Sequence, residues 1–192
     1  MATYRGYIGT YTKADSKGIY TFELDTDKKA LSTPKLAAKL GSPTYLNIAK
    51  DNSMLYAVIN DGEQGGVAAY RIDGNTGDLH FVNKQTADGP SPCHVSVDSA
   101  NQYVLSANYH SGTIASYTLD GDGSLDAPAS EVQHKGSGPH ERQEKAHVHY
   151  SGFTPDENYA VAVDLGIDRV ITYQLKEGKL EEVKSLAVAP GS

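Results

Sequence analysis

The sequence contains a single cysteine (Cys93), no tryptophan, no cluster of basic residues and no long apolar stretch. One cysteine excludes a framework of intrachain disulfides and any metal site built from several cysteines, and it is consistent with a reducing compartment. No segment approaches the roughly 20 apolar residues that cross a bilayer, and the start, MATYRGYIGTYT, lacks the charged-then-apolar pattern of a signal peptide. We therefore expect a cytoplasmic protein with no membrane partner.

The charged residues are dispersed, and acidic ones are in excess. The formal net charge is −7 over 192 residues, and the lysines and arginines are scattered along the chain. This balance argues against nucleic acid or an anionic membrane as the main partner and favours a small soluble ligand. With 39% hydrophobic residues, the chain is long enough and apolar enough to bury a core.

An internal repeat is the main signal of the fold. An alternating apolar pattern with a central aromatic residue recurs four times, at spacings of 48, 47 and 56 residues. The segments are GIYTFELD (18–25), GVAAYRID (66–73), TIASYTLD (113–120) and RVITYQLK (169–176), with the aromatic residues Phe22, Tyr70, Tyr117 and Tyr173. Alternation with a period of two predicts β-strands, and we expect the aromatic residues to pack between neighbouring repeats.

Each full repeat also has a hairpin before the aromatic strand and a turn-rich segment with a further strand after it. The hairpins are YLNIAKDNSMLYAVIN, HVSVDSANQYVLSANY and YSGFTPDENYAVAVDLG, in which Asp, Asn, Ser or Pro fills the turn. Four antiparallel strands in a unit of this length predict an all-β fold, a β-propeller of four-stranded antiparallel blades. We place three blades at residues 42–87, 91–135 and 146–189, with strands A to D running from the central channel outward. Residues 4–39 supply strands B, C and D of another blade.

Both ends of the sequence fall within the repeat. The first blade lacks its innermost strand, and Gly191-Ser192 matches Gly41-Ser42, which precedes the next inner strand. About four blades are too few for most closed rings, so we expect the N-terminal part of a longer propeller, or one that is completed by assembly. Unpaired blade edges favour self-association, and this is the protein partner that the pattern predicts.

Several motifs resemble one known family, the seven-bladed propeller lactonases, which include bacterial 6-phosphogluconolactonases and a fungal muconate-lactonising enzyme. The matching segments are YIGTYT, SPCHVSVD with LSANY, GSGPHERQEKAHVH and FTPDENYAVAVDLGIDRV. The resemblance implies hydrolysis of a phosphorylated sugar lactone, 6-phospho-D-glucono-1,5-lactone, in the oxidative pentose phosphate pathway. It calls for no metal and no other cofactor. It also implies about seven blades, so the later blades are expected to be absent from this sequence.

The third spacing of the repeat is about nine residues longer than the others, and the extra residues fall in GSGPHERQEK (136–145). This insertion joins strand D of one blade to strand A of the next, so it opens at the channel mouth. The ends of the B strands lie there too, because A and B are antiparallel neighbours. Side chains at the ends of B strands and the starts of A strands are therefore expected to converge; they are Asn60, Asn108 and Asp164, and His94 and His147 to His149.

Lactone hydrolysis needs a base, donors for the carbonyl oxygen and cations for a phosphate. His149 is the predicted general base, because it matches the histidine that the family places in the channel and imidazole titrates near neutrality. Arg142 is the predicted anion-binding residue, since guanidinium binds phosphate or carboxylate in a bidentate fork. His147 is expected to share the face of His149 on a regular strand. The remaining candidates for substrate binding are His94, Glu144, Asn108 and Asp164.

Each assignment has a simpler alternative. Arg142 pairs with Glu141 or Glu144 at the surface, Asn108 and Asp164 cap turns, His94 makes a hydrogen bond within its blade, and the HxH pair is structural or faces solvent. A metal site built from His140, His147 and His149 is a further alternative. Cys93 is interpreted as a small buried apolar residue, because no base is arranged for it.

Three functions remain open. The first is a lactonase acting on a phosphorylated sugar lactone, and the second is another lactone hydrolysis or a lactonising cycloisomerisation in the same channel. The third is a propeller that serves as a protein-binding platform. The absence of a WD dipeptide signature and of tryptophan argues against the platform, as does the gathering of unusual polar residues in one loop. Convergence of Arg142 and His149 on the channel would favour an enzyme.

Overall fold

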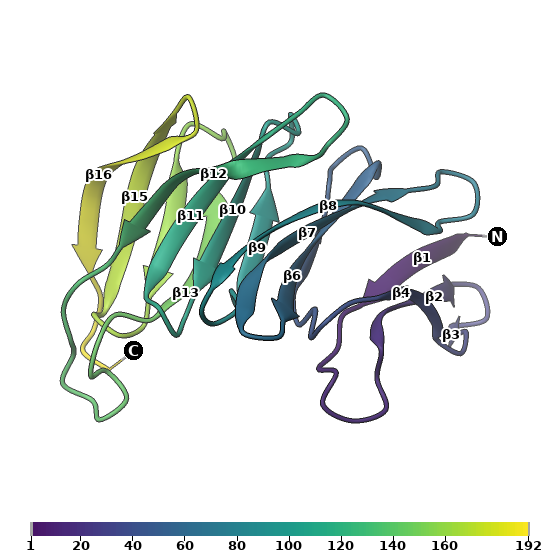
Figure 1. Cartoon of the computed structure of the whole chain (residues 1–192), viewed down its shortest axis with the longest axis horizontal. Coiled ribbons are helices and arrows are strands. Elements are labelled where there is room, and N and C mark those ends of the chain that lie inside the picture. The colour runs from purple at the N-terminus through teal and green to yellow at the C-terminus, as the bar shows by residue number, and fades with distance from the viewer. Residues whose placement is uncertain (1, 192) are drawn as a thin grey trace.

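The protein consists of four consecutive antiparallel sheets, as seen in the computed structural model, which describes residues 2–191 (Figure 1). The strands of the first sheet are β1 (Thr3–Ile8), β2 (Gly18–Asp25), β3 (Ala30–Leu31) and β4 (Lys35–Lys39). The second sheet contains β5 (Leu46–Ile48), β6 (Met54–Asp61), β7 (Gln64–Ile72) and β8 (Leu79–Asp88). The third contains β9 (His94–Val97), β10 (Tyr103–Asn108), β11 (Thr113–Leu119) and β12 (Leu125–Gln133), and the fourth β13 (Val148–Phe153), β14 (Ala160–Asp164), β15 (Arg169–Lys176) and β16 (Lys179–Ala187). The predicted all-β propeller architecture is confirmed.

The sheets have the order expected of propeller blades. In the second, third and fourth sheets the strands lie side by side in chain order. In the first sheet β3 and β4 both pair with β2, so this sheet has only three strand positions. The strand β1, which pairs with β2 in register from Thr3↔Asp25 to Ile8↔Tyr20, lies at its inner edge. No described residue belongs to a helix long and apolar enough to cross a membrane.

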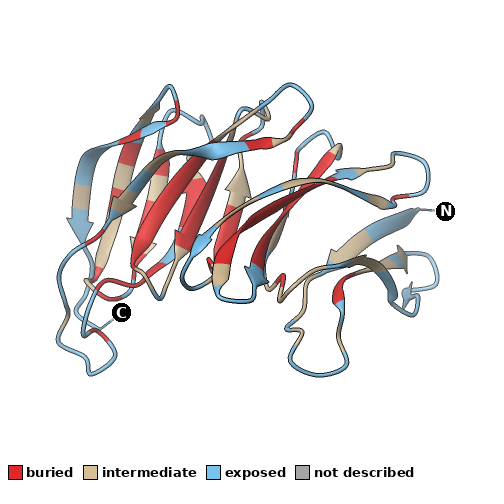
Figure 2. Ribbon diagram, in the orientation of Figure 1, coloured by how far each residue is buried: buried red, intermediate tan, exposed pale blue. Residues whose placement is uncertain are grey.

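The core lies between the blades, where the faces of adjacent sheets meet. Figure 2 shows the middle strands of the second and third sheets as largely buried and the outer strands as largely exposed. Tyr70, Tyr117 and Tyr173 are each at most 5% exposed and belong to the three apolar clusters that join successive sheets. The expected packing of these repeat aromatics between blades is confirmed. Burial of large apolar side chains contributes roughly 1.5–3 kcal/mol each to the adhesion of the blades. Hydrogen bonds between blades add to it, for example from the Tyr56 hydroxyl to the carbonyl oxygen of Gly123.

Two connections between blades differ greatly in length, and both lie at one end of the sheets. The short junction, residues 89–93, joins β8 to β9, and the long junction, residues 134–147, joins β12 to β13. The difference of nine residues lies where the sequence predicted the insertion. Figure 1 shows the long junction as the green loop at the lower left, and the purple loop between β1 and β2 reaches the same lower side. The short junction and the connections between B and C strands contribute residues to the candidate site.

Candidate active site

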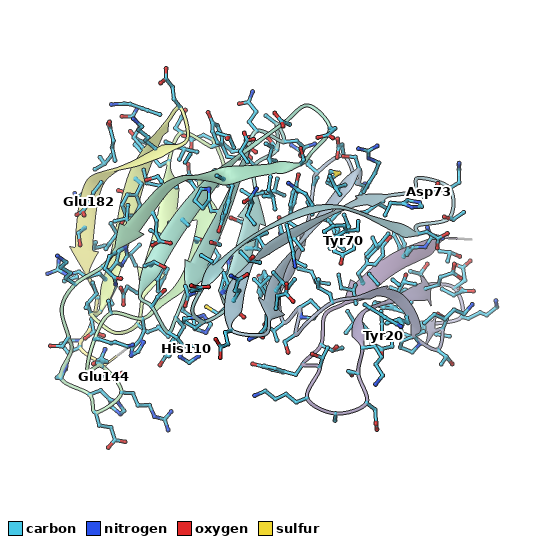
Figure 3. The ribbon with its side chains drawn as sticks, viewed as in Figure 1. Tyr20, Tyr70, Asp73, His110, Glu144 and Glu182 are labelled. Carbon is cyan, nitrogen blue, oxygen red and sulfur yellow. The ribbon has the colours of Figure 1, made fainter. Side chains whose placement is uncertain are left out.

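A cavity of about 560 Å³ opens at the end of the sheets where the junctions lie. Its wall takes residues from all four sheets and their connections, among them Lys13, Asn60, Ser91, Cys93, Tyr109 and His149. Figure 3 shows His110, which also lines the cavity, and Glu144 at this lower edge of the blades. The convergence of B-strand ends and A-strand starts is therefore observed for Asn60 and His149.

His149 projects into this cavity because the strand that carries it is irregular. The pairing of β13 with β14 shifts between Val148 and Tyr150, so His149 occupies a β-bulge. A bulge breaks the alternation of side chains, and both His149 and Tyr150 are exposed in succession. The His149 ring stands edge-on to the Tyr109 ring, with 6.0 Å between centroids. Its imidazole is thereby oriented at the cavity wall and accessible to a ligand.

His147 does not share this face, which corrects the prediction of a regular strand. It is only 4% exposed, its ring stacks on Tyr109 at 4.2 Å, and its Nδ1 lies 2.8 Å from the Tyr109 carbonyl oxygen. Its Nε2 lies 3.2 Å from Oε1 of Glu144, whose side chain is mostly exposed. A hydrogen bond from its own backbone N–H, and then one from His147, lower the pKa of Glu144. Both residues lie outside the cavity wall, and His147 holds Tyr109 in place, so their predicted contact with a ligand is not supported.

Asp164 is an anchor for the backbone and does not face a ligand. It is 1% exposed, its Oδ2 lies 2.7 Å from Nδ1 of His134, and its Oδ1 accepts hydrogen bonds from the N–H groups of His147 and Gly166. Nε2 of His134 lies 2.7 Å from the Tyr173 hydroxyl. Burial alone raises the pKa of the Asp164 carboxyl, but these hydrogen bonds outweigh burial and lower it. The prediction of Asp164 as a substrate contact is corrected, because both of its oxygens are occupied inside the protein.

Arg142 lies outside the main cavity. It is exposed and lines a separate hollow of about 220 Å³ together with Tyr109, His140 and Gln143. Tyr109 borders both spaces and so stands between Arg142 and His149. Within residues 2–191 no carboxylate forms an ion pair with Arg142, so the surface pairs with Glu141 or Glu144 do not form. The expected convergence of Arg142 and His149 on one space is not observed.

Asn108 and His94 are held within the fold. Asn108 donates to the carbonyl oxygen of Pro90 (2.7 Å), and its side-chain oxygen accepts from the N–H groups of His110 and Ser111, so it caps a turn. His94 is 7% exposed, and its ring lies between Tyr45 and Tyr150, with centroids 4.2 and 4.6 Å away. Burial, with a smaller effect of His149, lowers the pKa of His94 to about 4. Neither residue lines the cavity, so both predicted substrate contacts are corrected to structural roles.

Cys93 lies in the cavity wall with its thiol directed at backbone oxygens. Its Sγ lies 3.5–3.6 Å from the carbonyl oxygens of Ala107, Val148 and His149. Burial raises the pKa of this thiol, which keeps it protonated and unreactive. The thiol thus ties β9 to the bulge that carries His149. Among residues 2–191 no group of three or more His, Cys, Asp or Glu side chains could hold a metal ion. His140, His147 and His149 therefore do not form the metal site that the sequence left open.

Lys13 and Tyr109 are site residues that the sequence reasoning missed. Lys13 lies in the loop of residues 9–17 between β1 and β2, and Tyr109 follows β10 directly. Both occupy connections between B and C strands, at the end of the blades already assigned to the channel mouth. The signal that would have identified Lys13 is the length of its loop, since the equivalent connection between β6 and β7 has only two residues.

Comparisons with known proteins agree with this architecture. The family described as "Lactonase, 7-bladed beta-propeller" matches residues 5–192. The 6-phosphogluconolactonase of Bacillus subtilis (strain 168) is 62% identical over 192 residues, which are 100% of this chain and 55% of that protein. A crystal structure of a protein from Lactobacillus plantarum superposes with a TM-score of 0.92 at 39% identity, covering 99% of this chain and 55% of the other.

A more distant structure agrees in fold alone. The periplasmic gluconolactonase of Pseudomonas aeruginosa gives a TM-score of 0.84 at 23% identity, over 98% of this chain and 69% of the other. The chain spans about half the length of the curated relatives it matches. The match over nearly every residue, together with the blades and their junctions, shows that the chain belongs to the lactonase family of seven-bladed β-propellers.

Proposed function

We propose that the protein hydrolyses 6-phospho-D-glucono-1,5-lactone to 6-phosphogluconate, a reaction of the oxidative pentose phosphate pathway. The observation that carries the proposal is the 62% identity, across the whole chain, to a protein named 6-phosphogluconolactonase. The cavity supports it chemically, because about 560 Å³ is in the range of small-molecule sites and the exposed imidazoles of His110 and His149 line it. A small-molecule ligand is therefore preferred to a protein-binding platform.

His149 is the proposed general base. In the proposed step a water molecule gives a proton to the His149 imidazole as its oxygen attacks the lactone carbonyl carbon. The tetrahedral intermediate then collapses, the bond between this carbon and the ring oxygen breaks, and the ring oxygen becomes a hydroxyl by taking the proton held on the His149 imidazolium. The carboxylic acid that forms releases its own proton to solvent. The orientation of His149 by the bulge and by Tyr109 holds the imidazole at the cavity wall before the substrate arrives.

Polar groups on the cavity wall are the proposed donors to the substrate. Ser42, Thr44 and Ser91 contribute hydroxyls and Asn60 an amide, all within the same lining. The Ser91 hydroxyl oxygen is buried and has no hydrogen-bond partner within the described residues. Donors that face the carbonyl oxygen stabilise the negative charge that develops there in the transition state.

The proposal is tested by measuring hydrolysis of freshly generated 6-phosphogluconolactone above its spontaneous rate. The wild-type protein is expected to accelerate the reaction, and His149→Ala to lose about 10²–10⁴-fold because general-base catalysis contributes this much. His80→Ala, an exposed histidine on the outer strand β8, is the matched control and should retain the rate. No acceleration by the wild type, or an unchanged rate in His149→Ala, would overturn the proposal.

The same assay separates the lactonase from its enzymatic alternatives. Unphosphorylated glucono-1,5-lactone is offered at equal concentration, and a muconate-type substrate tests cycloisomerisation. The proposed function predicts the largest kcat/KM for the phosphorylated lactone. A larger kcat/KM for either other substrate would assign the cavity to that alternative.

A further inference from the structure

The charge of the cavity wall differs from that of the rest of the protein. The chain as a whole has a net charge of −7, with 24 acidic residues among 192. Within residues 2–191, however, no aspartate or glutamate lines this cavity, and its titratable side chains include Lys13, His110 and His149. A wall without carboxylates and with one permanent cation attracts an anionic ligand, which an acidic protein otherwise repels.

We propose that Lys13 binds the phosphate of the substrate and thereby selects phosphorylated over unphosphorylated sugar lactones. This assignment rests on the proposed function and replaces Arg142, the cation predicted from the sequence, which lines a different hollow beyond Tyr109. The chemical class of the ligand is a sugar lactone, or the corresponding acid, that carries a phosphate far from its carboxyl carbon.

The loop that carries Lys13 is fixed at its base and at Thr12, the residue directly before Lys13. The Thr10 hydroxyl donates to the carbonyl oxygen of Gly18 across the base of the loop (2.7 Å). Thr12 and Ser42 exchange hydrogen bonds, with the Ser42 N–H donating to Thr12 Oγ1 (3.1 Å) and the Thr12 N–H donating to Ser42 Oγ (3.3 Å). These links tie the loop to the connection before β5, which also lines the cavity.

The ammonium group of Lys13 is available for an anion. Its Nζ lies 5.4 Å from the centroid of the Tyr11 ring, a contact that orients the side chain and leaves its hydrogen-bond donors unused. In the described part of the chain no carboxylate forms an ion pair with it. A phosphate therefore meets a cation that no internal anion neutralises.

Lys13 and His149 reach the cavity from the first and the last of the four sheets. A ligand that contacts both residues must bridge the cavity, with its reactive carbonyl at His149 and an anionic group at Lys13. In 6-phosphogluconolactone the carbonyl and the phosphate are at opposite ends of the carbon chain, which satisfies this requirement. Ser91, from the short junction between the second and third sheets, lines the same cavity.

The proposal is tested by titration calorimetry with 6-phosphogluconate and with gluconate, which differ only in the phosphate. Lys13→Gln should weaken 6-phosphogluconate binding about 10- to 100-fold, the effect of losing a hydrogen bond to a charged group, and should leave gluconate affinity within about twofold. Lys13→Arg, which keeps the charge, should retain most of the affinity. Lys17→Gln removes the same charge from the same loop outside the cavity lining and should change neither affinity.

Two results would overturn the assignment of Lys13. One is an unchanged 6-phosphogluconate affinity in Lys13→Gln, and the other is an equal loss in Lys17→Gln, which would indicate a general charge effect. A selective loss in Arg142→Gln instead would assign the phosphate to the other hollow. These outcomes are independent of the hydrolysis assay: a protein that binds 6-phosphogluconate through Lys13 without hydrolysing the lactone would contradict the proposed function but not this subsite.

Discussion

The short junction and the long junction make the same kind of connection between blades, but different polar groups hold them in place. Each leads from the outer strand of one blade to the inner strand of the next, and each is fastened by the last residue of a neighbouring B strand. At the short junction this residue is Asn108, whose neutral amide binds the carbonyl oxygen of Pro90. At the long junction it is Asp164, whose carboxylate binds His134 and two backbone N–H groups.

The comparison shows that the longest and most polar loop is not the wall of the site. The short junction contributes Pro90 to Cys93 to the cavity, whereas no residue of 134–147 lines it. The long junction instead binds itself and the fourth sheet, for example through Gln143, which donates to the carbonyl oxygen of Leu165 and to Asp168 (2.6 Å each). Its role is to position the strand that starts with Val148 and carries His149.

The largest expected effect is the loss of the buried carboxylate. Asp164→Ala leaves Nδ1 of His134 and the N–H groups of His147 and Gly166 without their partner inside the protein, so the free energy of unfolding in urea should fall by about 3–5 kcal/mol. Asn108→Ala, the matched change at the short junction, should cost about 1 kcal/mol. If Asp164→Ala does not fold, Asp164→Asn provides the measurement. Equal losses at the two junctions would show that they do not differ as described.

A smaller loss is expected within the long junction itself. Gln143 is 5% exposed, and Gln143→Ala removes the partners of His140 N–H, Leu165 O and one Asp168 oxygen. The free energy of unfolding should decrease by about 2 kcal/mol, because buried polar groups lose their hydrogen bonds. Gln133→Ala, an exposed glutamine that binds backbone oxygens at the start of the same junction, should cost under about 1 kcal/mol. A larger loss for Gln133→Ala than for Gln143→Ala would mean that the hydrogen bonds at the start of the junction contribute more to stability than those of Gln143.

His94, the first residue after the short junction, should make the stability of the protein depend on pH. The pKa of His94 is about 4 in the folded protein and about 6.5 in an unfolded chain, so the unfolded state binds more protons between these values. Stability therefore falls as the pH decreases through this window, by about 2 kcal/mol from this group between pH 7 and pH 5.

His94→Phe tests this, because phenylalanine keeps an aromatic ring between Tyr45 and Tyr150 and does not titrate. The difference between the unfolding free energies at pH 7 and pH 5 should shrink by about 2 kcal/mol relative to the wild type. An unchanged difference would show that His94 is not the source of the acid sensitivity.

The smallest expected effect is at Tyr173, the last member of the buried network of Asp164, His134 and Tyr173. Tyr173→Phe removes only the hydroxyl bound to Nε2 of His134 and should lower the free energy of unfolding by about 1 kcal/mol. Phe81→Tyr is the control, because it adds a hydroxyl to an exposed ring on the outer strand β8. Its free energy of unfolding should be within about 0.5 kcal/mol of the wild-type value. A Tyr173→Phe protein as stable as the wild type would limit the network to the histidine and the carboxylate.

The fold was predictable because it repeats. The spacing of Tyr70 and Tyr117 fixed the length of a blade, and the turn residues between alternating strands fixed its hairpins. The candidate site was predictable only in part. His149 lines the cavity, as its place at the start of an A strand predicted, and its catalytic role stays a prediction. His147 was expected on the same face because a regular strand was assumed, and no residue in the sequence indicates the bulge between Val148 and Tyr150.

The remaining errors have a common physical cause. Polar residues at the end of a strand look alike in a sequence, whether they bind a ligand or neighbouring backbone groups. Asp164 was assigned to the substrate because the partner that occupies its carboxylate, His134, lies 30 residues earlier. Lys13 was missed for a different reason: it lies within a loop, and only the arrangement of all four sheets places it in the same cavity wall as His149.

The most direct test of the central claim, that the cavity and not the long junction is the ligand site, is to record the imidazole C–H resonances of the histidines during titration with 6-phosphogluconate. Assignment follows from single histidine variants. We predict that the resonances of His149 and His110, which line the cavity, shift with saturation, while that of His140 in the long junction does not. A shift of His140 with His149 and His110 unchanged would contradict the account and place the ligand beside Arg142.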